Sequence, residues 1–419
     1  MITTSTESPD LCGESTDSSL NSRLPIDNFR RNRSIGSSTL IEKGSKGMNS
    51  DRIDFGVFMS PMHPIGEDLT LLYERDLELA ELLDQLNYRE YWLGEHHSMG
   101  WNTIGAPELL IAAAAQRTSR LTLATGVATL PYHHPFMVAS RALHLDHLTR
   151  GRFVLGVGAG SIPVDARTLG VEMSDIRSMM GESLDTVVRL INSEERITRK
   201  TSWFTLNDAR MQIAPYREPI EVVAASVGSP NSMRLAGQHG ISVVSFGAPR
   251  PGHPPVDLRK QWAYAEESAA AHGNTMDRSK WRITLPVYVG ETRRQAIEDV
   301  RAGYNRWTQE YWRDVRGLNI SIDGVADDQL LDRSIDLGGV LVGSVEDVVA
   351  GIRHLQEVTG GFGTLLVYAQ DWAGWDKTKR SYERLARYVA PHFNGSTRRL
   401  NDSIDWFKQN RHTFSQLTP

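Results

Sequence analysis

The sequence predicts a closed (β/α)8 barrel. Eight short stretches with the composition of buried strands occur along the 419 residues, and a segment with helical periodicity follows each of them. Repeated strand–helix units form parallel sheets, and eight such units close the sheet into a barrel. A glycine-rich block, GVGAG at residues 156–160, follows the fourth strand rather than the first. It also lacks the sixth position of the dinucleotide-binding motif, so an open dinucleotide-binding sheet is not favoured.

The clearest unit is the stretch of residues 121–160. Residues 121–130 are apolar, small or β-branched, which is typical of a strand buried on both faces. Apolar residues then recur at helical spacing over residues 136–148, and Gly151 ends that pattern. A second apolar strand at residues 153–157 leads into the glycines. The stretch is therefore a βαβ unit, and ligands of parallel sheets bind where such strands end.

The other units follow the same pattern. Their strands are apolar runs bounded by proline, glycine or polar residues, and we expect them at residues 54–59, 91–94, 220–224, 241–245, 283–289 and 365–368. Their helices carry leucine, alanine or valine at helical spacing, and we expect them at residues 68–87, 107–117, 175–192, 231–239, 256–271, 291–305, 345–358 and 378–389.

Two segments depart from the strand–helix repeat. Residues 203–213 alternate around a polar turn and predict a small inserted hairpin. Residues 303–339 combine aromatic and charged side chains and are too long for an ordinary barrel loop. We expect this long segment to be a lid that closes over the open end of the barrel. An accessory helical insertion or an oligomer contact is the alternative.

The two ends of the chain differ from the middle in composition. Residues 1–50 are rich in serine, threonine and asparagine and predict a disordered tail without the apolar core of a secretory signal. The barrel is expected over residues 51–395 and a C-terminal tail over residues 396–419. The single cysteine, Cys12, lies in the polar N-terminal tail, so no structural disulfide is expected. This fits a reducing compartment, and we expect the protein in the cytoplasm.

Composition also limits the partners of the chain. The net charge is −5 with both signs interspersed, which provides no basic stripe for nucleic acid. No run of eighteen apolar residues is present that could span a membrane. With 40% hydrophobic residues, the chain can bury a sizeable core. We therefore expect a globular protein with a small-molecule partner.

A metal site is one interpretation of the residues at the strand ends. Glu95, His96 and His97 follow the second strand directly. Neighbouring residues on a strand point to opposite faces, so His96 and His97 could not both reach one ion. Strands three to five also end in small neutral residues rather than carboxylates. We expect no metal here.

A flat organic cofactor with a phosphate tail is the other interpretation. The small residues at two strand ends leave room for a ring to approach the backbone: Gly126, Ala128, Gly158, Ala159 and Gly160. Ser226, Gly228 and Ser229 stand at the start of a helix, where free N–H groups and the helix dipole favour an anion. Ser229 followed by proline is also a common plain helix start. Arg177 is close enough in sequence to reach the same phosphate, although spacing alone fits a surface arginine equally well.

Five blocks, in this order, carry a family resemblance: FGVFMSPMHP, YWLGEHHSMGW, LATGVATLPYHHP, DHLTRGRFVLGVGAG and IEVVAASVGSP. They resemble the bacterial luciferase-like flavin-dependent monooxygenases, over residues 53–393. Within that family the chain looks most like the limonene 1,2-monooxygenase group, chiefly through the first two blocks. The resemblance implies a TIM-barrel enzyme that takes reduced FMN from a separate flavin reductase and uses O2 to insert one oxygen atom into an apolar substrate.

The resemblance also implies positions for the cofactor. A non-proline cis peptide under the flavin ring maps to Gly126–Val127, and a histidine near the reactive edge of the flavin maps to His96. The full cofactor-binding set that we expect is Ser60, Gly126, Val127, Ala128, Gly158, Ala159, Gly160, Arg177, Ser226, Val227, Gly228 and Ser229. The catalytic luciferase subunit has arginine at the position of Ala159 and glutamate at that of Ala225. Either Arg177 and backbone alone hold the phosphate, or the flavin binds weakly and only when reduced.

The substrate is expected to be apolar and cyclic, terpene-like or a polyketide. A dry pocket would protect the oxygenating species, and the candidates to line it are Met59, Met62, Met99, Trp101 and Tyr132. The same side chains fit an ordinary core. Epoxidation and Baeyer–Villiger oxidation are both open, and His96 is the expected catalytic residue, either to set that choice or to stabilise the intermediate.

Other functions compete with this interpretation. The same barrel supports hydride transfer with a deazaflavin cofactor, and a non-catalytic flavin-binding subunit is a third reading. A metal-dependent hydrolase is an alternative function from a different class of enzyme. A homodimer is a candidate assembly.

Overall fold

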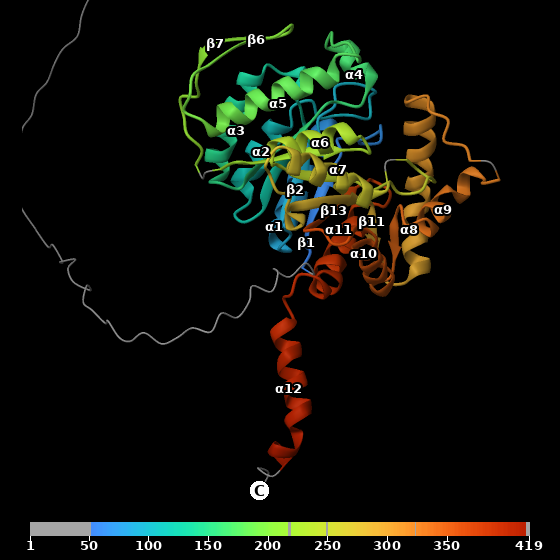
Figure 1. The fold of residues 1–419 in the computed structure, drawn as a ribbon. Coiled ribbons are helices and arrows are strands. Elements are labelled where there is room, and N and C mark those ends of the chain that lie inside the picture. The colour runs from blue at the N-terminus through green and yellow to red at the C-terminus, as the bar shows by residue number, and fades with distance from the viewer. Residues whose placement is uncertain (1–51, 217–218, 249, 323, 416–419) are drawn as a thin grey trace, which may run out of the picture. The chain divides into compact units, whose positions relative to one another are not determined.

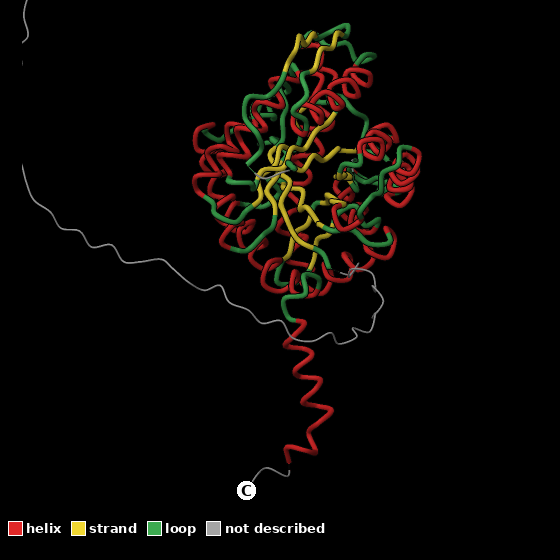
Figure 2. Tube along the Cα trace, turned by 60° about the vertical axis from the view of Figure 1, so that its left-hand side comes forward, coloured by secondary structure: helices red, strands yellow, loops and turns green. Residues whose placement is uncertain are grey.

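The computed structural model describes residues 52–216, 219–248, 250–322 and 324–415. The tail expected at residues 1–50 lies outside these residues. In the described part, eight parallel strands close into a barrel with helices around it, as predicted (Figure 2). The barrel strands are β1 (Asp54–Met59), β2 (Glu90–Leu93), β3 (Thr122–Thr125), β5 (Phe153–Gly158), β8 (Glu221–Ser226), β9 (Ser242–Phe246), β10 (Trp281–Leu285) and β13 (Thr364–Ala369).

The order of the strands fixes which ends face each other. Around the barrel they run β1, β2, β3, β5, β8, β9, β10 and β13, and β13 pairs with β1. The barrel closes between β3 and β5, where Leu123 pairs with Phe153. Strands β5 and β8 therefore stand across the barrel from β13 and β1. Ligands of such barrels bind at the end where all the strands finish.

The helices lie close to the predicted ranges (Figure 1). The short helix α4 and the late helices α9 and α12 add to the expected set. The helices are α1 (Leu69–Gln85), α2 (Pro107–Arg117), α3 (Pro135–Thr149), α4 (Pro163–Thr168), α5 (Ile176–Asn192), α6 (Pro230–His239), α7 (Leu258–Ala271), α8 (Arg293–Arg306), α9 (Leu330–Asp336), α10 (Val345–Thr359), α11 (Trp375–Arg384) and α12 (Arg398–Ser415).

Two strand predictions need correction. The seventh strand was expected to be continuous, but Pro286 separates β10 from β11 (Val287–Val289), because proline has no N–H to donate to a ladder. Strand β11 then leaves the barrel sheet and pairs with β12 (Leu341–Gly343). The third strand was expected to run to residue 130, but β3 ends before the Gly126–Val127 peptide, and β4 (Ala128–Thr129) follows it.

The inserted hairpin also starts earlier than predicted. It pairs β6 (Ile197–Lys200) with β7 (Thr205–Ala209), so the expected polar turn lies within β7. The turn forms instead at residues 201–204, because Thr201 Oγ1 accepts hydrogen bonds from the amides of Trp203 and Phe204.

The expected lid segment begins as a continuation of α8. A π-helical stretch, Trp307–Val315, extends that helix, and α9 follows after a loop. Its aromatic side chains are buried together with residues from the loops after β2 and β13, in a cluster that includes Trp101, Tyr304, Trp307, Tyr311, Trp312 and Trp372. The segment is therefore packed on the barrel mouth. Whether it opens as a lid stays a prediction.

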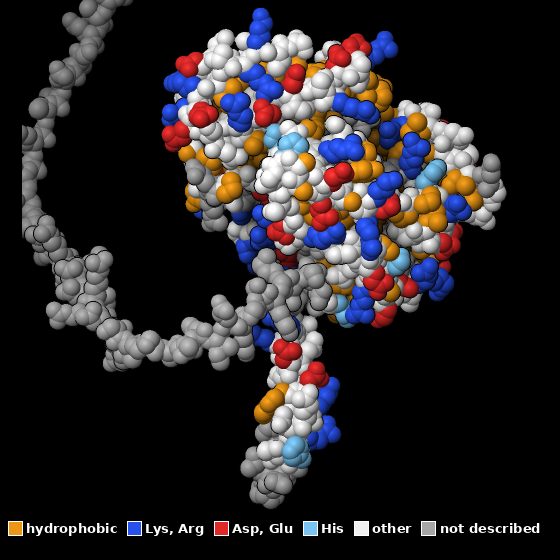
Figure 3. Space-filling view, in the orientation of Figure 1, with side chains coloured by type: hydrophobic (Ala, Val, Ile, Leu, Met, Phe, Trp, Pro, Cys, Tyr) orange, Lys and Arg blue, Asp and Glu red, His pale blue; other side chains and the backbone are white. Residues whose placement is uncertain are grey.

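The surface and the C-terminal region complete the description. Lys, Arg, Asp and Glu side chains are interspersed on the face shown in Figure 3. Every helix among the described residues is too short or too polar to cross a membrane. The range expected as a C-terminal tail contains α12, whose exposed apolar side chains are Leu400, Ile404, Trp406 and Phe407.

Candidate active site

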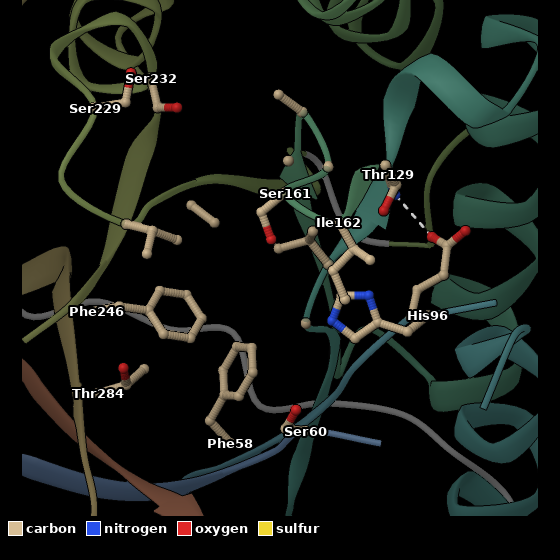
Figure 4. Close-up of a pocket in the computed structure, with 18 of the residues that line it drawn as sticks. Phe58, Ser60, His96, Thr129, Ser161, Ile162, Ser229, Ser232, Phe246 and Thr284 are labelled. Carbon is tan, nitrogen blue, oxygen red and sulfur yellow. Dashed lines mark hydrogen bonds between the residues drawn. The ribbon is translucent and has the colours of Figure 1, made fainter. Parts of the chain in front are cut away.

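A cavity of about 550 Å³ opens at the end of the barrel where the strands finish (Figure 4). This volume lies in the range of cofactor and substrate pockets. Most of its lining is apolar. The predicted site residues that line it are Ser60, Met62, His96, Gly126, Val127, Gly158, Ala159, Gly160, Arg177, Val227 and Ser229.

Three predicted cofactor residues do not line the cavity. The hydroxyl of Ser226 is buried behind it and bonds Gln261 Oε1 at 3.2 Å. Gly228 makes the turn before α6 with a φ of +106°, a conformation that favours glycine. Ala128 faces a small separate pocket beside His133. These residues support the cavity wall from behind.

Four predicted substrate residues also lie off the cavity. Met59 is buried in the main core, because it alternates with inward-facing Phe58 on β1. Met99 and Trp101 pack in or against the aromatic cluster under the segment after α8. The Tyr132 ring lies behind Gly160, and burial raises the pKa of its hydroxyl to about 12. Only Met62 of the five lines the cavity.

His96 faces the cavity from the loop after β2, and a carboxylate holds its other edge. His96 Nδ1 lies 3.0 Å from Asp165 Oδ2, on α4. The same carboxylate accepts bonds from the Ser98 hydroxyl and the His97 amide. Burial alone would raise the pKa of Asp165, but the bonds from His96 and Ser98 lower it. An ionised Asp165 fixes the proton on Nδ1 and leaves Nε2 for the cavity.

Glu95 and His97 belong to a second network, away from the cavity centre. His97 Nε2 and His133 Nε2 each lie 2.8 Å from Glu95 Oε1, and the Thr129 amide donates to Oε2 at 2.7 Å. Burial alone would raise the pKa of Glu95, but the bonds from His133 and His97 lower it to about 2. His96 and His97 thus bind different carboxylates, as their alternation predicts. Among the described residues, no three His, Cys, Asp or Glu side chains cluster closely enough to hold a metal.

The backbone between β3 and β5 forms the floor of the cavity beside His96. The Gly126–Val127 peptide is cis, as the resemblance implies. A Cβ on Gly158 would lie 2.6 Å from Val127 Cγ2, and one on Gly126 would lie 2.9 Å from the Phe58 ring. These glycines are required by close packing as well as by any ring above them. Bare backbone consequently faces the cavity here.

The opposite side of the cavity is suited to an anion. Ser229 caps α6, and its hydroxyl accepts from the Asn231 amide at 3.3 Å. Figure 4 shows Ser229 and Ser232 across the cavity from His96 and Ser60. Exposed Arg177 also lines the cavity, from α5 after β5, the strand that pairs with β8, and it makes no ion pair with a described residue. Hydroxyls, a helix N-terminus and a free guanidinium together form a donor set for a phosphate, which fits FMN.

Several lining residues were not predicted. Asp165 lies behind the lining, where it holds His96, and it was missed because it stands 69 residues from His96 in the chain. Asn231 and Ser232 follow the predicted helix start directly. The segment after α8 supplies a wall of Trp307, Tyr311, Trp312 and Arg316, and other unpredicted aromatics are Phe58, Phe246 and Tyr368. The aromatic content of residues 303–339 was the signal for this wall.

Comparison with known proteins defines the class. The luciferase-like monooxygenase family matches residues 53–360, and the chain belongs to that family. It is 51% identical to 4-hydroxyprotoasukamycin monooxygenase of Streptomyces nodosus subsp. asukaensis, over 85% of this chain and 96% of that one. It is 43% identical to limonene 1,2-monooxygenase of Rhodococcus erythropolis, over 82% and 87%. These relatives agree with the group that the first two sequence blocks indicated.

A solved structure of a relative supports the same fold. The oxygenating constituent of 3,6-diketocamphane monooxygenase from Pseudomonas putida, a type II Baeyer–Villiger monooxygenase in complex with FMN, superposes with a TM-score of 0.67. It is 26% identical, over 81% of this chain and 98% of that one. The barrel described here is therefore a monooxygenase fold of the luciferase-like type, in which a relative binds FMN.

Proposed function

We propose that this protein is the oxygenase of a two-component system that binds reduced FMN and inserts one atom of O2 into an apolar cyclic substrate. The observation that carries the proposal is the division of the cavity. A histidine held by Asp165 lies on one side and an anion-binding set at α6 lies on the other, with bare backbone and apolar walls between. When bound, reduced FMN supplies the electrons that activate O2.

The residues of the chain have separate tasks in this proposal. Ser229, Ser232 and Arg177 bind the phosphate and so place the ring over the backbone at Gly126 and Gly158. The aromatic wall after α8 excludes water, which strengthens polar contacts inside the cavity. His96, with Nδ1 held by Asp165, presents Nε2 to the reacting oxygen and holds or moves a proton there.

The partners follow from the same arrangement. The phosphate set lies at an exposed rim, so FMN can enter reduced from a separate reductase and leave oxidised. A relative described as an oxygenating constituent supports this division of labour. The substrate is apolar because most of the cavity lining is apolar, and cyclic because relatives are named for limonene and diketocamphane. We further propose that the protein acts in the cytoplasm, and a homodimer is the assembly to test.

A single-turnover experiment with labelled oxygen tests the function. Full-length protein is loaded anaerobically with photoreduced FMN, mixed with ¹⁸O2 and a panel of cyclic alkenes and ketones, and its products are analysed by mass spectrometry. We expect one ¹⁸O atom per product molecule, as an epoxide or a lactone. Products without ¹⁸O, or substrate oxidation without oxygen uptake, would favour hydride transfer instead. No turnover with any reductant would favour a non-catalytic subunit.

A further inference from the structure

The cavity contains one more cation than the cofactor needs. Apart from His96, its charged lining residues among those described are Glu95, Arg177 and Arg316. Glu95 is saturated by its two histidines and the Thr129 amide. Neither arginine makes an ion pair or a side-chain hydrogen bond with any described residue. FMN has one phosphate, and Arg177 lies beside the donor set for it.

Arg316 is held in place by stacking rather than by a counter-charge. Its guanidinium carbon lies 4.7 Å from the centre of the Trp312 ring and 6.0 Å from that of Tyr311. Both rings are buried in the aromatic cluster, with Tyr311 packed on Trp101 at 5.6 Å. Cation–π contacts of this kind position a guanidinium and leave all its N–H donors available. The N–H groups of Arg316 therefore have no acceptor among the described residues and are available to a ligand.

Arg316 also stands on the wrong side of the barrel for the phosphate. The rings on which it stacks, Tyr311 and Trp312, are buried in one cluster with Trp372, in the loop after β13. Arg177 lies in the first turn of α5, after β5, and the donor set follows β8. Because β13 is across the barrel from β5 and β8, the two arginines address different parts of whatever fills the cavity.

We propose that Arg316 determines substrate class by binding an oxygen acceptor on the substrate. On this proposal, which rests on the proposed function, the enzyme takes cyclic molecules that carry a carbonyl or enolate oxygen, in preference to the same skeleton without it. The surrounding wall of Trp307, Tyr311 and Trp312 is apolar, so a charge-assisted hydrogen bond there is strong. A site built to pair with an oxygen discriminates against an analogue that lacks it, because the donor is then left unpaired.

A matched pair of ligands tests the proposal by binding alone. Carvone and limonene share one skeleton, and only carvone has a carbonyl group. Dissociation constants are measured by anaerobic equilibrium dialysis of the full chain with excess photoreduced FMN. For the unaltered protein we expect carvone to bind about tenfold tighter than limonene, the value of one charge-assisted hydrogen bond. Arg316→Leu should bring the ratio close to one, and Arg316→Lys should fall between.

The control is Arg313→Leu, on the same π-helical segment. Arg313 pairs with Asp327 at 2.8 Å and does not line the cavity. Its loss should leave the carvone-to-limonene ratio unchanged. An unchanged ratio in Arg316→Leu, or binding of neither ligand by the unaltered protein, would overturn the proposal. Weaker reduced-FMN binding in Arg316→Leu with an unchanged ratio would assign Arg316 to the cofactor instead. The same dialysis without flavin separates a failure of the proposed function from a failure of this inference.

Discussion

The arginines at the two ends of the barrel differ in whether they have an ion-pair partner. Inside the barrel, near the start of the strands, Arg282 is 5% exposed and bridges Glu90 at 2.9 Å and Glu221 at 2.7 Å. The carboxylates have further donors, Trp92 Nε1 on Glu90 and the Ser242 hydroxyl on Glu221. At the open end, Arg177 and Arg316 have no counter-charge among the described residues.

The difference shows which charges serve the fold and which serve a ligand. A buried charge is tolerated only when it is paired and hydrogen-bonded, and the network around Arg282 meets that condition fully. A charged side chain that lines a cavity without a partner stays hydrated until a bound ligand supplies that partner. In this barrel the paired, buried charges lie near the start of the strands, and the unpaired charges lie at the end where the strands finish. Other barrels of this fold likewise have their active site at the end where the strands finish, while the opposite end contributes to stability.

The largest effect is expected when the inner network is broken. Arg282→Leu leaves Glu90 buried and Glu221 half-buried without their cation, so we expect a loss of about 3–5 kcal/mol in the free energy of unfolding. Urea unfolding followed by circular dichroism measures it. Arg316→Leu is the matched control at the open end and should change stability little. A loss below about 1 kcal/mol for Arg282→Leu would contradict the assignment of this network to stability.

Glu95 should behave like the inner network although it lies near the mouth. Its pKa is lowered from 4.5 to about 2, so it stabilises the fold fully above pH 4.5 and loses that contribution as the pH falls towards about 2. We expect Glu95→Gln to lose roughly 3 kcal/mol at pH 7. The urea concentration at the midpoint of unfolding should become similar for the unaltered protein and Glu95→Gln as the pH is lowered from 7 to 3. Parallel midpoints over that range would show that the charge of Glu95 is not the cause.

A smaller and purely kinetic effect is expected from the carboxylate behind His96. Asp165→Asn should release His96 Nδ1 and lower the single-turnover rate about tenfold, or 1.4 kcal/mol, while reduced-FMN affinity stays the same. Stopped-flow absorbance after mixing with O2 measures the rate. Glu172→Gln, at an exposed position nearby, is the control. Equal rates in Asp165→Asn and the control would show that Asp165 does not position His96 for the reaction.

The smallest effect should come from a paired but exposed arginine. Arg196 bonds Asp208 at 3.1 Å on the β6–β7 hairpin, and both side chains are more than half exposed. Arg196→Gln should change the free energy of unfolding by less than about 0.5 kcal/mol, since exposed pairs are weak. A larger change by urea unfolding would mean that pairing, rather than burial, sets the order of these effects.

Local patterns were enough to predict the barrel from the sequence. Strand and helix periodicity is a property of neighbouring residues, so the eight units and the capped start of α6 at Ser229 could be read directly. The errors arose where a single residue decides pairing. Pro286 ends a ladder and Thr201 moves a turn, and neither changes the hydrophobic pattern around it.

Long-range pairing limited the prediction of the site. His96 came from the family resemblance, but its partner Asp165 lies 69 residues away, and Arg282 and Glu90 are 192 residues apart. Such contacts exist only once the barrel is closed. The substrate residues were predicted by type, and methionine and tryptophan fit a core as well as a pocket. Met59 and Trp101 illustrate this, since they lie in the core and in the aromatic cluster.

The most direct test of the central claim compares two flavins. The claim is that the cavity holds reduced FMN with its phosphate at α6 and Arg177. Photoreduced FMN and photoreduced riboflavin, which lacks the phosphate, are titrated anaerobically into the full chain and into Arg177→Gln. We predict that the unaltered protein binds FMN at least about tenfold tighter than riboflavin and that Arg177→Gln loses most of this preference. Equal affinity for the two flavins in the unaltered protein would contradict the account.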